Sequence, residues 1–382
     1  MYEDFTIENF RSFSSLQLND LASVNLIAGK NNVGKTALLE ALFIHAGMWN
    51  PELVLRINSF RGIDLVVDLS PNSAPPWDNL FNNFNLDLPI TLSARINNID
   101  YIISISSLLS NSNTLYQANE PSKHASSLID SPSYASVSSS DVVSYRPKMV
   151  LELKTEIKGA PDSDARSGVG AYRLLVDGSG IRVDPQPPQP RFITIFLGPK
   201  LRSLQDAERY TKLVIDSKEQ VLLDALRKIE PRLRRLELLQ LGNKLTLFGE
   251  LKGVRKLVPL PLMGEGISYA ASLALSITAA KNGVVLVDEV ENGIHYSALE
   301  GFWATISDIA SKFNVQVFAT THSLECIQAA NKVFLEANST RNFALYRLER
   351  VISRGEGPTS VRAVRFDEKE LEVAIKQGWE VR

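Results

Sequence analysis

The sequence has 382 residues, 44% of them hydrophobic and 22% charged, a composition that indicates a folded protein and excludes a wholly disordered or fibrous chain. Its net charge of -2 gives the chain as a whole no attraction to a polyanion, so any nucleic-acid site must be a local patch. The longest apolar stretches, such as 269–280, are shorter than the ~20 residues that a membrane span needs, and the single cysteine, Cys326, cannot form an internal disulfide.

The first 50 residues predict strands, a loop and a helix in direct succession. Residues 2–10 alternate loosely between apolar and polar side chains, and the apolar run 23–28 predicts a second, more buried strand. A helix is predicted from Lys35 to Ala46, because leucines and a phenylalanine recur there at spacings that build one apolar face.

The middle of the chain predicts short elements and a long insertion. Five prolines between 50 and 98 favour short elements joined by turns. The segment 104–144 is rich in Ser and Asn and poor in charge, which is typical of a surface insertion with weak order. Strands are predicted at 148–158 and 172–183, and four prolines between 185 and 190 predict a stiff connector.

A helical and charged pattern covers 200–236, where basic residues outnumber acidic ones, and we call this segment the helical arm. The last third then alternates between helices and apolar strands. In order, we predict a helix at 267–280, a strand at 284–287, a helix at 296–312, a strand at 315–319 and a helix at 323–330. Apolar strands separated by helices predict a parallel sheet that is covered on both faces.

A phosphate-binding loop is the strongest motif. The segment Gly29-Lys30-Asn31-Asn32-Val33-Gly34-Lys35-Thr36 fits G-x-x-x-x-G-K-[ST] without a mismatch, between a predicted buried strand and a predicted helix. The glycines permit a tight turn, and backbone N–H groups at the helix start attract phosphates; the alternative is a turn without a ligand. We expect Lys35 to neutralise the β- and γ-phosphates of ATP, and Thr36 to bind Mg²⁺. Nucleotide contacts are assigned to these eight residues and to Ala37.

Two acids follow the apolar strand at 284–287. Asp288 and Glu289 come just past its carboxyl end, where ligands of open α/β sheets bind. We expect Asp288 to hold Mg²⁺ and Glu289 to orient or deprotonate the attacking water. Alone, such a pair is often only part of a solvated loop, but together with the phosphate loop it predicts a catalytic site.

The segment Thr320-Thr321-His322-Ser323 closes the next predicted strand and begins a helix, which Ser323 could simply cap. A side chain at the end of this strand can also face a γ-phosphate. We therefore assign His322 a catalytic role beside Lys35 and Glu289, against the alternative of a structural histidine.

With the opening segment Ile7–Phe13, these motifs resemble ABC-type ATPases of the family that includes RecF, the structural maintenance of chromosomes (SMC) proteins and the overcoming-lysogenization-defect ATPases. Within it, the chain is most similar to a compact bacterial AAA-type subgroup often found in anti-phage defence loci. The resemblance implies an α/β fold, a P-loop NTPase head of ABC type with a mixed sheet and flanking helices. Residues 1–85 and 256–382 would form this head. An insertion at 86–255 would add a β-rich, Ser-rich lobe and the helical arm at 200–236.

The resemblance also implies two further nucleotide contacts. Arg11 corresponds to a position where the N-terminal sheet meets the nucleotide, so it is expected to contact the adenosine or a phosphate, with a solvated loop arginine as the alternative. Leu262–Gly266 corresponds to the signature loop, which caps the nucleotide of the opposite subunit through Gly264, Glu265 and Gly266. Met263 replaces the usual serine, whose hydrogen bond of about 1.5–3 kcal/mol is lost, so backbone amides must supply the contact. An ordinary loop and helix cap is the alternative.

The segment Glu291–His295 resembles the subgroup's segment after the catalytic acid, which lies near the dimer seam. His295 could therefore face the second nucleotide, although a loop leading into a helix explains it equally well. No glutamine stands clearly where the family's lobe-coupling glutamine would be.

These resemblances predict an ATP-hydrolysing homodimer, or a higher-order assembly of it, that binds two nucleotides head to tail and uses ATP and Mg²⁺. It would act as a switch or scaffold for a separately encoded effector, such as a nuclease, in anti-phage defence. Because the sequence ends at Arg382 without the nuclease domain that full-length overcoming-lysogenization-defect proteins append, we expect no nuclease activity in this chain.

The alternative function is a RecF- or SMC-like repair or chromosome-maintenance ATPase, whose arm holds nucleic acid. The candidate contacts are Arg227, Lys228, Arg232, Arg234 and Arg235, for which a solvated helix face is the plainer explanation. A transporter subunit ranks last, because it needs a membrane-protein partner and usually the signature serine. The start of the sequence lacks the basic and apolar pattern of a secretory signal, so we expect a cytoplasmic protein without a membrane partner.

Overall fold

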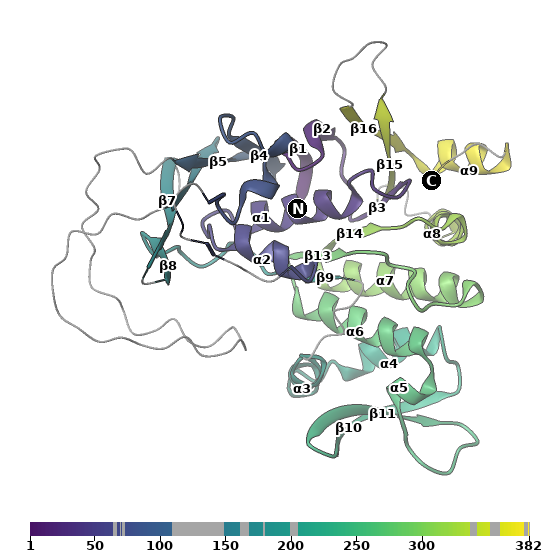
Figure 1. The fold of residues 1–382 in the computed structure, drawn as a ribbon. Helices are drawn as coiled ribbons and strands as arrows, with labels where there is room; N and C mark the ends of the chain where they lie inside the picture. Colours follow the sequence, from purple (N-terminus) through teal and green to yellow (C-terminus); the bar gives the residue numbers. More distant parts are fainter. Residues whose placement is uncertain are drawn as a thin grey trace.

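The structure is a computed structural model of the chain (Figure 1). It describes residues 1–63, 67–68, 70, 73–108, 149–160, 168–178, 180–198, 205–336, 342–351, 360–377 and 381. The Ser- and Asn-rich segment predicted to be weakly ordered therefore lies outside the described residues from 109 onward, and so do the first residues of the helical arm.

A mostly parallel sheet forms the centre of the described residues. Its strand order is β16-β15-β3-β14-β13-β9. The strands are β3 (Val24–Gly29), β9 (Thr194–Leu197), β13 (Val284–Val287), β14 (Gln316–Thr320), β15 (Phe343–Val351) and β16 (Ser360–Phe366). All run parallel except β16, which joins β15 antiparallel at the edge. The predicted α/β class with a mixed sheet is confirmed, and β9, β15 and β16 are added to it.

A second, antiparallel sheet has the order β2-β1-β4-β5-β6-β7-β8 in the described part of the chain. Its strands are β1 (Tyr2–Phe10), β2 (Phe13–Leu18), β4 (Ile90–Ile96), β5 (Ile99–Leu108), β6 (Met149–Lys158), β7 (Gly168–Asp177) and β8 (Gly180–Asp184). Because β4 pairs with β1, the β-rich part of the predicted insertion 86–255 is not a separate lobe. The pairing with β4 covers an edge of β1 that would otherwise stay open. Strand β9, which belongs to the same insertion, joins the central sheet beside β13.

Helices and the antiparallel sheet cover the two faces of the central sheet. The helices are α1 (Lys35–Ala46), α2 (Leu53–Phe60), α6 (Glu265–Ala279), α7 (Leu299–Phe313), α8 (Leu324–Glu336) and α9 (Glu368–Lys376). Ile27, Leu286 and Phe318 pack on the side of α1 and the antiparallel sheet, whereas their neighbours Leu26 and Val285 pack on the side of α6 and α7. The predicted bounds of α1 are confirmed. Burial extends around the helix beyond the one predicted apolar face, because α1 lies between two sheets.

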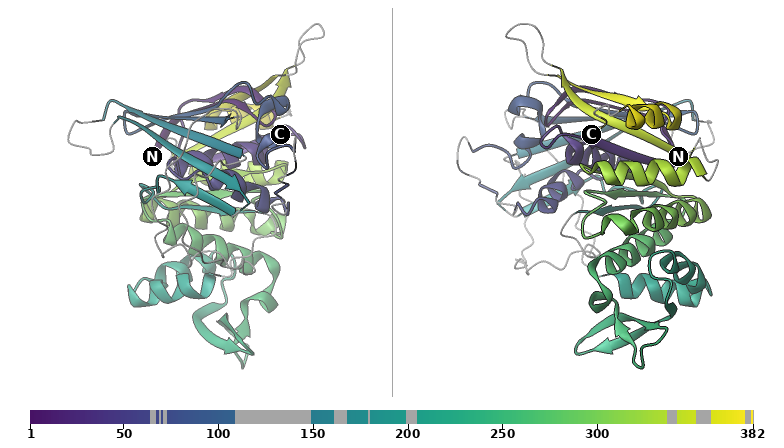
Figure 2. Two further views of the ribbon diagram at one scale, coloured as in Figure 1. Left: turned by 60° about the vertical axis from the view of Figure 1, so that its left-hand side comes forward. Right: turned by 90° about the vertical axis from the view of Figure 1, so that its right-hand side faces the viewer.

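A smaller lobe lies beyond α6 and α7, at the end of the molecule away from the β15–β16 hairpin (Figure 2). It contains α3 (Asp206–Ile215), α4 (Glu219–Arg227), β10 (Leu233–Leu241), β11 (Lys244–Leu251), β12 (Val258–Pro259) and α5 (Leu260–Met263). The prediction of helix up to residue 236 is wrong after α4, since Leu236 pairs with Gly249 across an antiparallel hairpin. Short 3-10 turns occur at Asp78–Leu80, Asn82–Phe84 and Tyr296–Ala298. No helix of the described residues combines the length and the apolar character that crossing a membrane requires.

Candidate nucleotide-binding site

Two glycines determine the shape of the predicted phosphate loop. The loop joins β3, which is buried throughout, to the start of α1. Gly29 and Gly34 have φ angles of 146° and 110°, in the region that side chains disfavour. A Cβ on Gly34 would lie 2.6 Å from the ring of Phe13, and one on Gly29 would lie 2.7 Å from the carbonyl oxygen of Leu348. Any larger residue at these two positions of the phosphate loop would clash with its neighbours, which explains the two glycines of the sequence motif.

Lys35 is a buried cation at the first position of α1, with 9% of its surface exposed. Its Nζ donates hydrogen bonds to the carbonyl oxygens of Gly29 and Lys30, at 2.6 and 3.2 Å. Burial lowers the pKa of Lys35, and the negative charges of Asp288, Glu291 and Glu289 oppose that lowering. Lys35 thus lies in the field of the carboxylates that follow β13.

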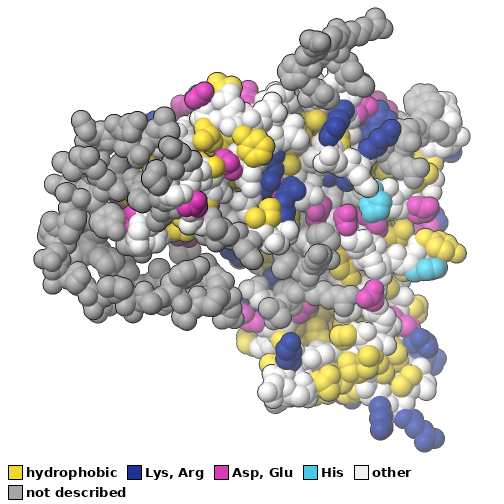
Figure 3. Space-filling model, in the orientation of Figure 1, with side chains coloured by type: hydrophobic (Ala, Val, Ile, Leu, Met, Phe, Trp, Pro, Cys, Tyr) yellow, Lys and Arg dark blue, Asp and Glu magenta, His cyan; other side chains and the backbone are white. Residues whose placement is uncertain are grey.

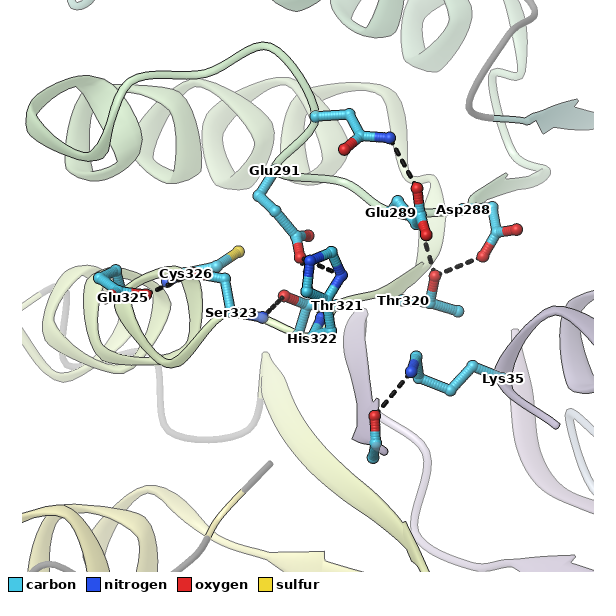
Figure 4. Close-up of polar contacts among 12 residues, drawn as sticks. Lys35, Asp288, Glu289, Glu291, Thr320, Thr321, His322, Ser323, Glu325 and Cys326 are labelled. Carbon is cyan, nitrogen blue, oxygen red and sulfur yellow. Dashed lines mark hydrogen bonds and ion pairs between the residues drawn. The ribbon is translucent and has the colours of Figure 1, made fainter. Parts of the chain in front are cut away.

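The phosphate loop meets the two predicted acids through one hydrogen bond. The hydroxyl of Thr36 donates to Oδ2 of Asp288 at 2.8 Å, between residues 252 positions apart in sequence. The hydroxyl of Thr320 donates to Oδ1 of Asp288 at 2.6 Å and accepts from the backbone N–H of Glu289 at 2.8 Å (Figure 4). The ends of β3, β13 and β14 therefore converge on one polar cluster.

The Thr36 hydroxyl and the Asp288 carboxylate fit a magnesium ion by their chemistry. Both are oxygen donors, and Mg²⁺ is usually held by one or two carboxylates together with substrate phosphates and water. In the described part of the chain, no cluster of three or more His, Cys, Asp or Glu side chains could hold a metal by itself. The donor set suits an ion that arrives with a nucleotide.

Glu289 is held in an unusual backbone conformation, with a φ angle of 52°. Its carboxylate accepts a hydrogen bond from the side-chain amide of Asn292 at 2.8 Å. Strained non-glycine residues cluster at functional sites, where surrounding contacts hold them in place. Asn292 and Thr320 lie in segments that the sequence analysis singled out, but their own roles depend on contacts that only the folded chain brings about.

His322 is half-exposed and pairs with Glu291, a residue that the sequence analysis gave no role. The backbone N–H of His322 donates to Oε1 of Glu291 at 2.9 Å, and Nδ1 of the ring lies 3.2 Å from the same oxygen. Figure 4 shows the ring beside this carboxylate, with Glu289 and Asp288 toward the right of the view. The predicted catalytic residues Lys35, Glu289 and His322 thus come from elements that end at one edge of the central sheet.

Open space adjoins the phosphate loop. A cavity of about 520 Å³ is lined by Lys30–Val33 and by Arg347–Arg350 of β15. Arg350 closes one side by donating to the carbonyl oxygen of Asn32 at 2.6 Å. Of the other predicted contacts, Lys30, Asn31 and Asn32 are exposed, whereas Val33 and Ala37 are buried. Figure 3 shows acidic side chains and a histidine together on this face, with Lys and Arg side chains nearby.

Arg11 has a partner within the fold. Its guanidinium lies 2.8 Å from the buried carboxylate of Glu40, which also binds Arg61 at 2.6 Å, and it donates to Oδ1 of Asn58. Burial lowers the pKa of Arg11 to about 10. These contacts fix Arg11 near the end of α2, and its contact with a nucleotide stays a prediction.

The predicted signature loop lies at the start of α6, where Gly264 has a φ angle of 128°. Met263 turns inward, with its sulfur 2.9 Å from where a Cβ on Gly249 would be. The side chain of Glu265 lies against Gly293, and Gly266 faces the carbonyl oxygen of Gly293. The loop is thus joined to the segment that follows Glu289.

His295 is exposed and serves locally as a cap. Its Nδ1 lies 2.9 Å from the hydroxyl of Ser297, and its ring packs on Tyr296 with centroids 4.3 Å apart. It also accepts from the backbone N–H of Ser297 at the start of the 3-10 turn. A loop that leads into a helix, the alternative given for His295, accounts for these contacts. Its contact with a second nucleotide stays a prediction.

The basic residues proposed to hold nucleic acid have acidic partners. Arg227 pairs with Asp224, Lys228 with Asp308, Arg232 with Glu230, and Arg234 and Arg235 with Glu250. Their charges are therefore largely balanced by neighbouring acids. The solvated helix face that was the alternative does not apply to Arg234 and Arg235, because they lie on β10.

Comparison with known proteins decides the family. The model of the family described as "AAA domain, putative AbiEii toxin, Type IV TA system" matches residues 24–327, which is more than half of the chain. The chain belongs to this AAA family. The matched range contains the phosphate loop, Asp288, Glu289 and His322, and the predicted AAA-type ATPase is confirmed.

Individual relatives of this AAA ATPase are distant. An ATP/GTP phosphatase of Helicobacter pylori is 21% identical over 352 residues, covering 90% of this chain and 92% of that protein. An uncharacterized protein of Methanocaldococcus jannaschii is 45% identical over 65 residues, 17% of this chain and 57% of that protein. Among solved structures, the SMC head domain from Thermotoga maritima is 11% identical with a TM-score of 0.40, and covers 95% of this chain and 98% of its own.

Proposed function

We propose that this AAA ATPase binds ATP at the edge of the central sheet where β3, β13 and β14 end, and hydrolyses it slowly. The observation that carries the proposal is the 2.8 Å hydrogen bond between Thr36 and Asp288. It joins the phosphate loop to the acid that follows β13, so that both can act on one nucleotide. The Helicobacter pylori relative, described as an ATP/GTP phosphatase, is in keeping with this chemistry.

Each residue has a distinct task in the proposed reaction. Backbone N–H groups of the loop and the start of α1 bind the phosphates, and Lys35 balances their charge. Thr36 and Asp288 would hold Mg²⁺, which when bound neutralises phosphate charge. Glu289 takes the proton of the attacking water while Asn292 holds its carboxylate in place. His322 contacts the γ-phosphate from the end of β14.

The active form would be a head-to-tail homodimer. The start of α6 packs on the opposite side of the central sheet from α1, which supports a proposal that the signature loop of one chain caps the nucleotide of a second copy. Leu262, the first residue of this loop, is 77% exposed, and Tyr296, in the segment after Glu289, is 70% exposed. Since Met263 faces inward, the backbone N–H groups of Gly264 and Gly266 would make the contact. ATP would favour the closed dimer, and hydrolysis would release it.

We propose that dimer closure controls a separately encoded effector protein, such as a nuclease, in anti-phage defence. The family description, which names a toxin of a toxin–antitoxin system, is in keeping with such a role. Direct grip on DNA by the arm is the second candidate. The ion pairs of Arg227, Lys228 and Arg235 favour the effector hypothesis over DNA binding. Basic side chains that are already paired with acids neutralise few DNA phosphates, so they release few counterions and add little affinity for DNA.

Glu289→Gln tests the ATPase and the dimer together. Gln keeps the size and the hydrogen bond of the side chain but cannot accept the proton. ATP binding should persist, turnover should fall by about 10²–10⁴-fold, and light scattering should detect an ATP-dependent dimer. Normal turnover would exclude Glu289 as the base, and a monomer at saturating ATP would exclude the proposed dimer.

Copurification from the native source separates the two cellular roles. The effector hypothesis predicts a stable complex with an unrelated protein, and little affinity for DNA in the purified ATPase. ATP-dependent DNA binding that weakens steeply with salt would instead favour the second candidate.

A further inference from the structure

One carboxylate oxygen of Glu291 lies close to two nitrogens of His322. The backbone N–H of His322 donates to Oε1 at 2.9 Å, and Nδ1 of the ring lies 3.2 Å from that oxygen. An ionised carboxylate can only accept, so Nδ1 carries the hydrogen. The remaining ring nitrogen, Nε2, is then the one available to another group.

The pair crosses between two neighbouring strands of the central sheet. Glu291 follows β13 and His322 follows β14, 31 positions away. The side chain of Glu291 is 11% exposed, whereas that of His322 is 49% exposed. The ring thus reaches toward solvent from a buried anchor, and rotation about its side-chain bonds would break the contact at Nδ1.

The surroundings of Glu291 explain why it is available for this task. Its negative charge acts on Lys35, Tyr269 and Cys326, which belong to three different helices. In the described part of the chain, its second oxygen is buried without a hydrogen-bond partner. Burying a carboxylate whose second oxygen has no hydrogen-bond partner lowers the stability of the folded protein. This cost points to a functional reason for a glutamate at this position.

We propose that Glu291 is a positioning residue, which accepts from Nδ1–H of the His322 ring and so turns Nε2 toward the γ-phosphate of ATP, to which the imidazolium form of the ring donates its Nε2–H. The inference rests on the proposed ATPase function. Asn292 holds Glu289 in the same way, so two adjacent residues each fix one side chain of the site. Glu291 contacts neither water nor phosphate in this account and acts through the histidine.

A set of four variants tests this role by steady-state ATPase kinetics. Glu291→Ala and His322→Ala should each lower kcat by about 10- to 100-fold, as is typical when an orienting partner is lost. The double variant should be no slower than His322→Ala, because Glu291 has no effect once the ring is gone. Glu291→Gln retains an acceptor oxygen and should keep kcat within about tenfold of the native value.

Two readouts separate positioning from a general loss of structure. The affinity for ATP should remain near the native value in all four variants, so that the loss appears in kcat and not in KM. Glu300→Gln is the matched control, because it changes an exposed glutamate that pairs with Lys332, and its kcat should be unchanged.

Several results would overturn the inference. If the losses of the two single variants multiply in the double variant, Glu291 acts independently of His322. A loss in Glu291→Gln as large as that in Glu289→Gln would make Glu291 a base or a metal ligand. If Glu291→Ala has the kcat of the native protein, Glu291 has no role in positioning His322.

The tautomer of His322 tests the geometry without any turnover. In ¹⁵N spectra of histidine-labelled protein, assigned with His322→Ala, the native ring should carry its hydrogen on Nδ1. In Glu291→Ala it should shift to Nε2. If the native protein hydrolyses no ATP, the proposed function fails, whereas an Nε2–H tautomer in the native protein contradicts this inference alone.

Discussion

The two ends of α1 each bury a basic side chain, with opposite consequences. At its start, Lys35 lies among carboxylates that oppose the lowering of its pKa by burial. In its last turn, His45 is buried with no acidic partner among the residues that the structure describes, and burial lowers its pKa to about 3. His45 instead bonds the hydroxyl of Tyr2 and the carbonyl oxygen of Tyr101. Burial lowers the pKa at both ends, so the ordinary pKa of each base, 10.5 for Lys35 and 6.5 for His45, and its charged partners decide which one can stay charged.

This contrast follows from where each end lies on the central sheet. The start of α1 lies at the carboxyl ends of β3, β13 and β14, where Asp288 and Thr320 project. The last turn lies toward β1 and β5, among Tyr2 and Tyr101. Reactive charge is thus confined to one edge of the sheet, as is usual for open α/β folds.

The largest effect is expected at the charged end. Lys35→Ala removes a cation that meets the β- and γ-phosphates, an interaction of about 3 kcal/mol, so ATP affinity should fall by about 100-fold. Calorimetry of ATP with Mg²⁺ measures this loss directly. Lys281→Ala, at an exposed turn, is the matched control and should bind normally. Unchanged affinity in Lys35→Ala would mean that this end of α1 is not the phosphate site.

A smaller effect is expected at the neutral end. Because the folded pKa of His45 lies near 3 and its ordinary value is 6.5, only the unfolded chain takes up this proton between those pH values. Stability is therefore present above pH 6.5 and decreases as the pH falls. From pH 7 to pH 5, this one group should lower the free energy of unfolding by about 2 kcal/mol.

Urea unfolding of the native protein and of His45→Gln at both pH values measures this contribution. The variant is expected to lose less stability than the native protein on going to pH 5. Equal losses would show that His45 is already charged in the folded state, and the contrast between the ends of α1 would disappear.

The smallest effect is expected in the lobe, where charges are exposed and paired. Arg235 pairs with Glu250, and both side chains are accessible to solvent. Arg235→Ala should change the free energy of unfolding by at most about 1 kcal/mol, with a smaller change at high salt. A loss of several kcal/mol by chemical denaturation would mean that the lobe stores more electrostatic energy than the nucleotide edge.

The elements that carry the candidate nucleotide site could be predicted from the sequence because their signals are local. The phosphate loop, the apolar strand before Asp288 and the helix from Lys35 to Ala46 each appear within a few consecutive residues. In contrast, the roles of Thr320 and Glu291 depend on contacts between residues that follow or end different strands. Asn292 contacts Glu289 three positions away, but that contact depends on the unusual backbone conformation of Glu289, which no sequence pattern predicts.

The lobe and the antiparallel sheet were predicted less well, for two physical reasons. The segment Leu233–Leu241 is rich in Leu, Arg and Glu, which favour a helix, but pairing with β11 overrides that preference. The pairing of β4 with β1 joins residues about 90 positions apart, and alternation within each strand does not specify its neighbour.

The central claim is that Thr36 and Asp288 serve one magnesium ion on one ATP. Calorimetry of ATP with and without Mg²⁺, on the native protein, Thr36→Val, Asp288→Asn and the double variant, tests it most directly. The account predicts one ATP per chain, a metal-dependent gain in affinity that each single variant weakens, and a double variant that loses less than the sum of the two. Independent, additive losses, or affinity that ignores Mg²⁺ in the native protein, would contradict it.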